Sequence, residues 1–251
     1  MSIKKNLIYG IHPLQEALLS GKPFDKIFIR KGLKGENISR IKEMAGNFHI
    51  PLQQVPVEKL NRLTGKNHQG VVGLVAAVDF FTIEDIVPAL YEQAKIPFIL
   101  ILDQISDIRN FGAICRTAEA AGVHAIVIPA KGAAGINEDA MKTSAGALNL
   151  IPLCRSHNLP AVCRFLKNSG INLMAASEKA AVIYQQADMQ GPLAIIMGAE
   201  DKGIQAELLQ YADMNIKLPM KGVISSLNVS VAAGILMYEV VRQRDISFKK
   251  N

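Results

Sequence analysis

The chain has few cysteines and no long apolar segment, and both absences narrow its class. Its three cysteines, Cys115, Cys154 and Cys163, form no CxxC pair, so neither a disulfide framework nor a structural zinc site is indicated. Apolar runs such as residues 96–102 are far shorter than the roughly 18 residues that cross a membrane, and no cleavable leader follows the basic N-terminus. We therefore expect a cytoplasmic protein without membrane insertion, with the cysteines as buried apolar fillers.

Several signatures of common enzymes are also missing. There is no GxGxxG fingerprint, no GxxxxGK[ST] phosphate loop, no GxSxG elbow and no HExxH zinc motif. The five histidines lack the spacing of metal ligands: His12, His49, His68, His124 and His157. Hydrolase, P-loop and zinc chemistry are therefore disfavoured, as is a nicotinamide-dependent oxidoreductase on a dinucleotide fold.

The composition is that of a folded protein whose positive charge lies near the N-terminus. Of 251 residues, 49% are hydrophobic and 20% are charged, which predicts one large domain or two modest ones. Residues 1–78 hold 12 Lys/Arg against 5 Asp/Glu, whereas residues 79–96 hold 1 against 4. Seven basic residues crowd one stretch: Lys22, Lys26, Arg30, Lys31, Lys34, Arg40 and Lys42. This cluster favours a polyanion such as nucleic acid, the alternative being a solvated surface without a partner.

Patterning divides the chain into two α/β domains joined by an acidic segment. Residues 1–78 form the first domain, with helices expected at 8–19 and 37–47 and strands at 26–29 and 71–78. Thr82 and Asp85 resemble a capping box, so residues 79–96 are predicted to contain a linker helix.

From residue 97 to residue 251, short apolar runs alternate with helical stretches. This pattern is typical of a parallel sheet whose two faces are covered by helices. Six runs are predicted strands: 98–102, 125–128, 150–153, 172–175, 193–197 and 214–218. The predicted fold class is therefore α/β.

Three segments place polar residues where predicted strands end, the edge at which ligands collect in open α/β sheets. The first, residues 102–122, turns through residues 107–110 and enters a helix bearing Arg116 and Glu119. These two side chains share a helix face, because they are three residues apart. Taken alone, such a pair is more often a surface ion pair than a catalytic device.

The second segment, IIMGAEDKG at residues 195–203, places Gly198 and Glu200 directly after a strand. Glycine there permits close approach of a ligand to the backbone, although an ordinary strand-to-helix turn would have the same composition.

The third segment, residues 218–241, contains a helix that Ser225 or Ser226 can N-cap. The free amides at Ser226, Leu227 and Asn228 can hold a polar ligand, although any capped helix has such amides. The predicted inner face of this helix comprises Val231, Ile235, Tyr238 and Val241.

Together the three segments resemble the signature motifs of the SpoU (TrmH-like) family of S-adenosylmethionine-dependent RNA ribose 2′-O-methyltransferases. The resemblance rests on Asn110, Arg116 and Glu119, on the GAE turn at 198–200, and on PM at 219–220 followed by SSLNVS at 225–230. YGIHPLQEAL at 9–18 and NHQGVVGLV at 67–75 are similar to the substrate-binding domain of the branch that methylates guanosine in bacterial 23S rRNA. The likeness extends from about residue 7 to residue 244.

The resemblance implies a SPOUT fold, in which the C-terminal parallel sheet is threaded into a deep trefoil knot, preceded by a ribosomal-protein-like RNA-binding domain. It implies a homodimer joined through the knotted domain and methyl transfer to a ribose 2′-hydroxyl, most closely of a guanosine in 23S rRNA. It also implies S-adenosylmethionine as cofactor, without a metal, held by residues at the motif positions. These are Gly198, Glu200, Leu218, Met220 and Leu227.

The catalytic positions implied by the resemblance are Asn110, Arg116, Glu119, Ser226 and Asn228. In the family the matching arginine is sometimes assigned as the general base, but a guanidinium pKa above about 12 makes that role costly. We therefore expect Arg116 to clamp the phosphate and hydroxyl oxygens of the target nucleotide, held by Glu119 and supported by Asn110. Ser226 and Asn228 are expected to orient the ribose or Arg116.

Some positions depart from the family pattern. Ile108 and Phe111 replace the usual Pro and Leu, Lys131-Gly132 replaces an Arg-Ser pair, and Asp201 stands where a small residue is frequent. These changes affect the choice of RNA more than the reaction. The alternatives are a methyltransferase acting on tRNA or on another rRNA site, and a catalytically idle RNA-binding assembly factor.

Overall fold

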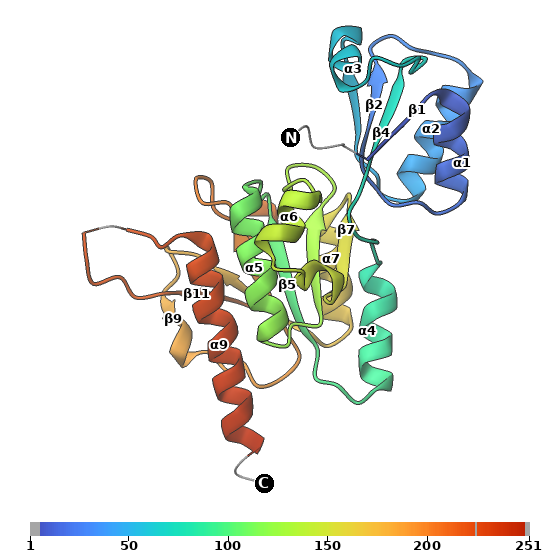
Figure 1. Cartoon of the computed structure of the whole chain (residues 1–251). Helices are drawn as coiled ribbons and strands as arrows, with labels where there is room; N and C mark the ends of the chain where they lie inside the picture. The colour runs from blue at the N-terminus through green and yellow to red at the C-terminus, as the bar shows by residue number, and fades with distance from the viewer. Residues whose placement is uncertain (1–5, 224, 249–251) are drawn as a thin grey trace. The chain divides into compact units, whose positions relative to one another are not determined.

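The computed structural model describes residues 6–223 and 225–248, and the chain divides into two compact units (Figure 1). Residues 1–79 and 136–138 form the first unit. The second unit comprises residues 80–135 and 139–251.

The first unit is a four-stranded sheet with helices on both faces. Its elements are β1 (Leu7–Tyr9), α1 (Ile11–Leu19), β2 (Phe24–Arg30), α2 (Glu36–Asn47), β3 (Leu52–Val55), α3 (Val57–Leu63) and β4 (Val71–Val75). The strand order is β1-β4-β2-β3, with β4 antiparallel to both β1 and β2. Apolar residues of α1 and α2 pack on one face, and Leu60 of α3 packs with Phe28 and Val55 on the other. The predicted α/β class is thus confirmed for this unit.

The predicted helix at residues 8–19 was wrong at its start. Residues 7–9 form β1, and the helix begins only at Ile11, because Gly10 has a φ of 91°, outside the helical range. The strands β1 and β3 and the helix α3 were missed, since segments of three to seven residues are too short for a clear period.

The basic cluster read from the sequence does not stay together in space. Lys22 precedes β2 and Lys31 follows it, so the seven residues of this strand separate them by roughly 20 Å. Other basic residues lie at the end of β2 and in the segments that follow β2 and β3, which leave the same edge of the sheet because the two strands are parallel. They are Arg30, Lys31, Lys34, Lys59, Arg62 and Lys66.

The helix α4 (Ile83–Glu92) belongs to the second unit rather than forming a separate linker, which corrects the linker expectation. Ile83, Val87 and Leu90 are buried in the core of that unit, because they lie on one face of the helix. Thr82 precedes the helix, and its hydroxyl donates to the Asp85 carboxylate instead of capping the backbone.

The second unit is built on a seven-stranded parallel sheet. Its strands are β5 (Phe98–Asp103), β6 (Ala125–Pro129), β7 (Leu153–Ser156), β8 (Asn172–Ala176), β9 (Val182–Ile183), β10 (Leu193–Gly198) and β11 (Met214–Lys217). They are arranged in the order β7-β6-β5-β10-β8-β11-β9, with all neighbours parallel. The strand predicted at 150–153 begins only at Leu153. A 3-10 turn at Ala147–Asn149 precedes it, and residues 150–152 connect this turn to the strand.

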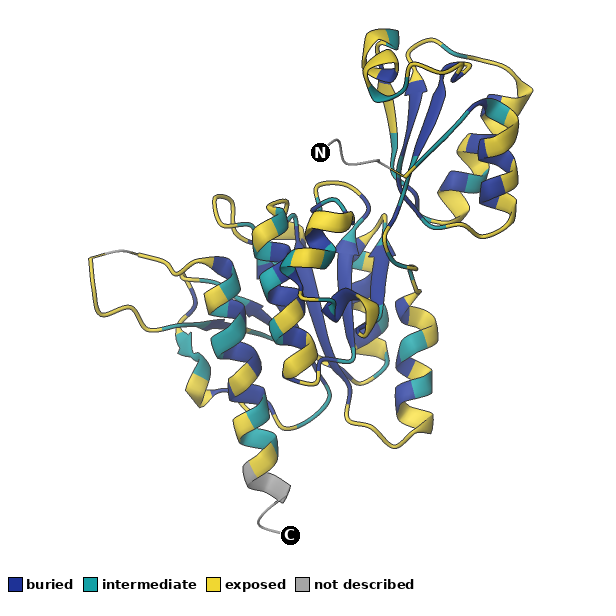
Figure 2. Ribbon diagram, viewed as in Figure 1, coloured by how far each residue is buried: buried dark blue, intermediate teal, exposed yellow. Residues whose placement is uncertain are grey.

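Helices cover both faces of this sheet, as the sequence pattern predicts. Its remaining helices are α5 (Ile108–Ala120), α6 (Glu138–Thr143), α7 (Leu159–Asn168), α8 (Ala206–Leu209) and α9 (Val229–Phe248). α4 and α7 pack into one core cluster, whereas α5 and α9 lie side by side on the opposite face (Figures 1 and 2). Within the described residues, no helix combines the length and apolarity needed to span a membrane.

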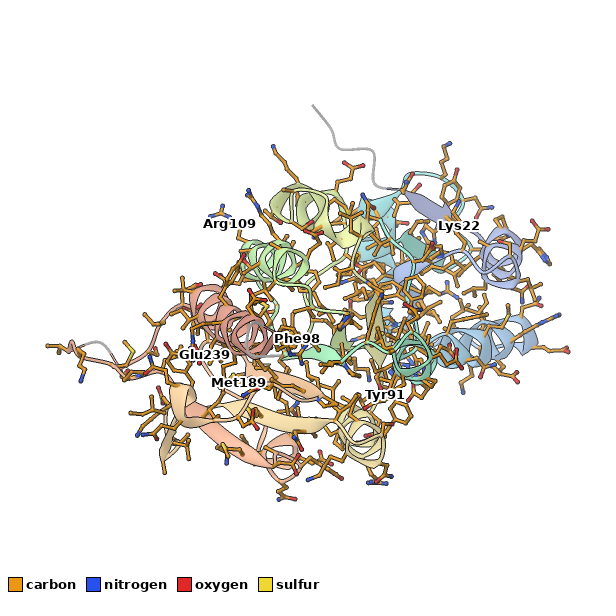
Figure 3. The ribbon with its side chains drawn as sticks, turned by 90° about the horizontal axis from the view of Figure 1, so that it is seen from below. Lys22, Tyr91, Phe98, Arg109, Met189 and Glu239 are labelled. Carbon is orange, nitrogen blue, oxygen red and sulfur yellow. The ribbon has the colours of Figure 1, made fainter. Side chains whose placement is uncertain are left out.

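The helix α9 is anchored near its C-terminal end to the segments that precede β5 and β10. The Gln243 side-chain oxygen accepts from the Met189 backbone N–H at 2.9 Å, and the Gln243 amide donates to Glu239 at 2.8 Å. Met189 and Glu239 are labelled in Figure 3. Arg244 donates to the Pro97 carbonyl at 3.1 Å and to the Gly191 carbonyl at 2.9 Å. These bonds hold the last helix against the amino edge of the sheet.

All three cysteines are buried, as the sequence predicts. Burial raises the pKa of Cys115, raises that of Cys154 to about 12 and, with a smaller contribution from Asp103, raises that of Cys163 to about 11. Since the thiolate is the reactive form, we expect no alkylation of the native protein by iodoacetamide at pH 8, and three modified thiols after unfolding in urea. The intact mass of the protein, measured before and after unfolding, gives the number of modified thiols in each state. Rapid modification of the native protein would contradict this prediction.

Candidate functional site

The carboxyl edge of the second unit's sheet brings the three motif segments to one place. β5 and β10 are neighbours, and Gly198 pairs in register with Asp103, so both strands end together. The first segment leaves this edge into α5, the second forms the loop after β10, and the third connects β11 to α9.

Asn110 joins the three segments by hydrogen bonds. Its backbone N–H donates to the Asp107 carboxylate at 2.7 Å, which caps α5. Its side-chain amide donates to Glu200 Oε2 at 3.3 Å, and its side-chain oxygen accepts from the Asn228 amide at 3.1 Å. The helix α5 begins at Ile108, so Asn110 belongs to its first turn rather than to the preceding turn that the sequence predicts.

Asn228 caps α9, which corrects the prediction that Ser225 or Ser226 does so. The helix begins at Val229, and Asn228 Oδ1 accepts from the Ser230 backbone N–H at 3.0 Å. Asparagine is as favourable a cap as serine, so composition alone did not separate the candidates.

The predicted inner face of α9 was also wrong. Val231 and Tyr238 are 51% and 52% exposed, and Ile235 and Val241 are only half-buried. The buried side consists of Val229, Ala233, Leu236, Met237 and Val240. Because apolar residues occur around the whole helix, their spacing does not single out one face.

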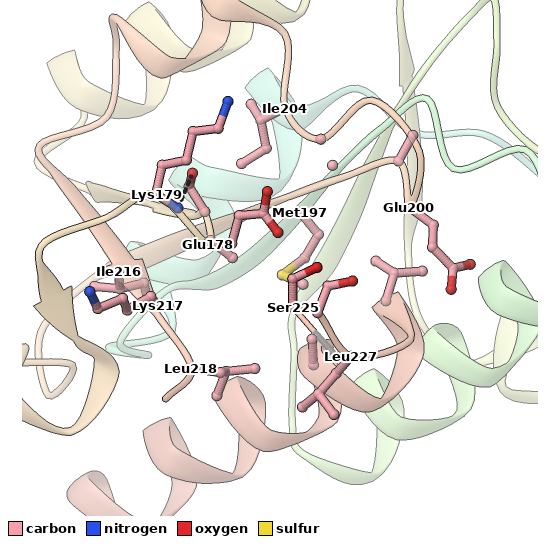
Figure 4. A pocket seen from close by; sticks show the side chains of 18 of the residues that line it. Glu178, Lys179, Met197, Glu200, Ile204, Ile216, Lys217, Leu218, Ser225 and Leu227 are labelled. Carbon is pink, nitrogen blue, oxygen red and sulfur yellow. Dashed lines mark hydrogen bonds between the residues drawn. The ribbon is translucent and has the colours of Figure 1, made fainter. Parts of the chain in front are cut away.

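A cavity of about 350 Å³ opens beside this hydrogen-bonded cluster (Figure 4). The ends of β8, β10 and β11 line it, together with the segment leading into α9. All five residues expected to hold a cofactor lie on its wall: Gly198, Glu200, Leu218, Met220 and Leu227. Ser226 lines it too.

The wall also carries charged residues that sequence reasoning did not assign to the site, among them Glu178 and Lys179. Their position just after the strand predicted at 172–175 was the available signal, since polar residues after parallel strands face the same edge. In the part of the chain that the structure describes, no group of three His, Cys, Asp or Glu residues could hold a metal ion.

The loop after β10 folds tightly over Gly198. The Gly203 backbone N–H donates to the Ala199 carbonyl at 2.7 Å, which closes the loop on itself. A Cβ atom at Gly198 would lie 2.1 Å from the Gly203 carbonyl carbon and 2.3 Å from the Ile204 nitrogen. The close approach of the backbone therefore requires glycine at position 198.

Arg116 and Glu119 lie on α5 and are both exposed. Their expected ion pair is not formed, since no salt bridge or hydrogen bond joins them among the described residues. An exposed pair at this spacing is worth only about 0.2–0.5 kcal/mol, which is too little to hold two long side chains together. The structure thus brings Asn110, Glu200 and Asn228 together and leaves the Arg116 guanidinium in solvent.

Comparisons with known proteins match both units. Residues 97–238 match the family model described as "SpoU rRNA Methylase family", and residues 7–81 match "RNA 2'-O ribose methyltransferase substrate binding". The chain is similar to a putative TrmH family tRNA/rRNA methyltransferase, YacO, of Bacillus subtilis, with 37% identity over 98% of both chains.

Two solved structures have a fold similar to that of this chain. The SpoU methyltransferase AviRb of Streptomyces viridochromogenes, in complex with AdoMet, has a TM-score of 0.61 at 22% identity, over 96% of this chain and 90% of that one. A TrmH/SpoU tRNA modifying enzyme of A. aeolicus has a TM-score of 0.56 at 31% identity, over 65% of this chain and 85% of that one. With the family models and the relative, these findings show that the chain belongs to the SpoU (TrmH) family of RNA 2′-O-ribose methyltransferases.

Proposed function

We propose that this protein transfers a methyl group from S-adenosylmethionine to a ribose 2′-hydroxyl in 23S rRNA, at a guanosine. The observation that carries the proposal is the position of Asn110. It links the GAE loop, through Glu200, to the start of α9, through Asn228, beside a cavity large enough for a small ligand.

The cavity fits a cofactor of this kind. Its volume of about 350 Å³ lies within the usual range of small-molecule sites. Met220 and Leu227 are each 36% exposed on its wall, which leaves apolar surface for a ligand to cover. In this proposal Gly198, Glu200, Leu218, Met220 and Leu227 hold S-adenosylmethionine, which supplies an electrophilic methyl group on sulfur.

The chain's own residues position the hydroxyl and stabilise the charge that develops on its oxygen. Arg116 remains protonated and binds the phosphate and hydroxyl oxygens of the target nucleotide as a fork. Glu119, on the same side of α5, fixes the guanidinium once RNA excludes water from this face. Asn110, Ser226 and Asn228 orient the ribose at the mouth of the cavity.

The first unit binds the RNA in this proposal. Its match to a substrate-binding model and its basic residues after β2 and β3 support this role, since phosphate contacts dominate the affinity of such modules. A ribosomal substrate also agrees with action in the cytoplasm. The tRNA alternative remains open to test, because YacO is named as a tRNA/rRNA methyltransferase.

Mapping of 2′-O-methyl marks in cells with and without this protein tests the reaction and its target together. We expect one guanosine mark in 23S rRNA to disappear without the protein and to return when purified protein methylates the unmodified rRNA in vitro. Loss of a tRNA mark instead would overturn the rRNA target. Absence of S-adenosylmethionine binding in a calorimetric titration would overturn the proposed methyltransferase activity and favour a catalytically idle RNA-binding assembly factor.

We also propose that the C-terminal part of the second unit is threaded as a deep trefoil knot. The strand order supports this path. β10 inserts between β5 and β8, β11 lies beyond β8, and α9 then returns to pack on α5. Such threading is very rare among folds, so it would not follow from strand patterning alone.

The proposed homodimer uses the outer stripe of α9, which is exposed at Val231 and Tyr238 and half-buried at Ile235. These residues are spaced by four and three positions, so they form one continuous apolar strip on the side away from the core. We expect the double variant Val231→Asp/Tyr238→Asp to sediment as a monomer, because burying two carboxylates in the interface is costly.

The matched control for this variant is Leu19→Asp, which places a carboxylate at an exposed leucine of the first unit and should leave the dimer intact. Sedimentation velocity measures the mass of each variant. A wild-type protein that sediments as a stable, active monomer would contradict the dimer proposal.

A further inference from the structure

Asp103 carries a fully buried carboxylate at the base of the site. It is the last residue of β5, and none of its surface is exposed to solvent. Both of its oxygens accept a hydrogen bond from Gln205: the backbone N–H donates to Oδ2 at 2.7 Å, and the side-chain amide donates to Oδ1 at 2.7 Å. Neither residue is among the motif positions that carry the family resemblance.

The Asp103–Gln205 pair closes the loop that forms one wall of the cavity. This loop runs from Gly198, which pairs with Asp103 in the sheet, to Gln205, which precedes α8. All six residues between them line the cavity. Asp103 therefore ties the far end of the loop to the strand beside which the loop begins.

The same strand end also leads into the other half of the site. Four residues after Asp103, Asp107 caps α5, whose first turn carries Asn110. Asn110 meets the loop again at Glu200. The loop is thus fixed to the first motif at two points, by the buried pair at its base and by the Asn110–Glu200 bond at its tip.

Core stability alone does not account for this carboxylate. A carboxylate loses several kcal/mol of hydration when it is buried, and its two partners here are neutral amides. Apolar residues of similar volume would stabilise a core at least as well. Two short charge-assisted hydrogen bonds to one residue instead fix its position and orientation closely, which a flexible loop needs if its backbone is to contact a ligand.

We propose that Asp103 is a positioning residue for cofactor binding, which acts by holding the loop from Ala199 to Ile204 in its binding conformation through Gln205. The inference rests on the proposed function in so far as the ligand of this cavity is S-adenosylmethionine. Asp103 does not touch the ligand; it reduces the conformational freedom that the loop would otherwise lose on binding.

The test compares two substitutions at position 103. Asp103→Ala removes both acceptors and leaves the Gln205 amide without its partner, so we expect the Kd for S-adenosylhomocysteine to rise about 10- to 100-fold. Asp103→Asn can keep both hydrogen bonds, since its oxygen accepts from the Gln205 N–H and its amide can donate to Gln205 Oε1 after that side chain flips. Its Kd should therefore stay within about 3-fold of the wild-type value, a small difference on the free-energy scale of binding.

Hydrogen exchange in the ligand-free protein supplies a readout that is independent of binding. We expect backbone amides in residues 199–205 to exchange faster in Asp103→Ala than in the wild type or Asp103→Asn, because the loop opens locally. Amides of β5 and β6 should keep their protection.

Asp213→Ala is the matched control. The Asp213 carboxylate also ties a segment to a strand, accepting from the Leu173 N–H at 2.8 Å, but it lies at the start of β11, outside the cavity wall. This variant should lower the melting temperature and leave the Kd unchanged.

The proposal is overturned if Asp103→Ala lowers the melting temperature as the control does but binds S-adenosylhomocysteine with unchanged Kd. It is equally overturned if Asp103→Asn loses affinity as much as Asp103→Ala, because the hydrogen bonds would then not be the cause. A wild-type protein that binds neither S-adenosylmethionine nor S-adenosylhomocysteine would instead refute the proposed function.

Discussion

We expect Arg116→Lys to lower the single-turnover rate of methyl transfer to the RNA substrate by about 100- to 1000-fold, the usual cost of losing one group that stabilises charge in a transition state. Lysine keeps the positive charge but presents it as a point, so it cannot hold a phosphate oxygen and the 2′-hydroxyl oxygen together. Arg116 is exposed on α5 and its fork is not engaged by Glu119, so substitution should leave the stability of the protein unchanged. The loss should appear in the rate at saturating cofactor rather than in cofactor affinity.

Arg164→Lys serves as the control for this substitution. Arg164 is an exposed arginine of α7 that donates to the Tyr211 hydroxyl at 3.2 Å, and it lies outside the motif segments. Its variant should react at the wild-type rate. If Arg116→Lys also retained a near-normal rate, the clamp role of Arg116 would be refuted.

Gly198→Ala reduces cofactor affinity about 100-fold and lowers the stability of the protein, by about 1–3 kcal/mol, the typical cost of overpacking. The added Cβ would lie 2.1–2.4 Å from backbone atoms of Gly203 and Ile204, and backbone cannot move aside as a flexible side chain can. The loop from Ala199 to Ile204 must therefore shift, and this loop lines the cavity. Calorimetric titration with S-adenosylmethionine measures the affinity, and thermal unfolding measures the stability.

Gly234→Ala is a sharp contrast to that substitution. Gly234 lies inside α9, and a Cβ there would meet its nearest neighbour, Thr117 Cγ2, at 3.7 Å, an ordinary contact distance. Since alanine favours helix more than glycine does, this variant should gain about 0.5–1 kcal/mol of stability and keep its affinity. Equal affinities for Gly198→Ala and the wild type would exclude the loop after β10 from the binding site.

Apolar runs predicted the strands of the second unit because buried parallel strands are almost uniformly hydrophobic. β5, β6, β8, β10 and β11 lie where they were predicted, within one residue at each end. Apolar patterning did not reveal β9, which has only two residues, and it placed the start of β7 too early, because apolar residues also precede that strand. The start of β7 is ambiguous in the sequence because residues 150–152 are as apolar as a buried strand, although they lie outside the sheet.

By itself, the sequence determined the α/β class, the family and the polar residues that follow the strands, since these depend on local composition, order and spacing. Only the tertiary structure decided which of those residues meet. Asn110 reaches Glu200 and Asn228 across separations of 90 and 118 residues, while Arg116 and Glu119, three apart, do not pair. The physical reason is that a hydrogen bond requires placement to within a fraction of an ångström, which strand order and helix packing set and no local pattern encodes.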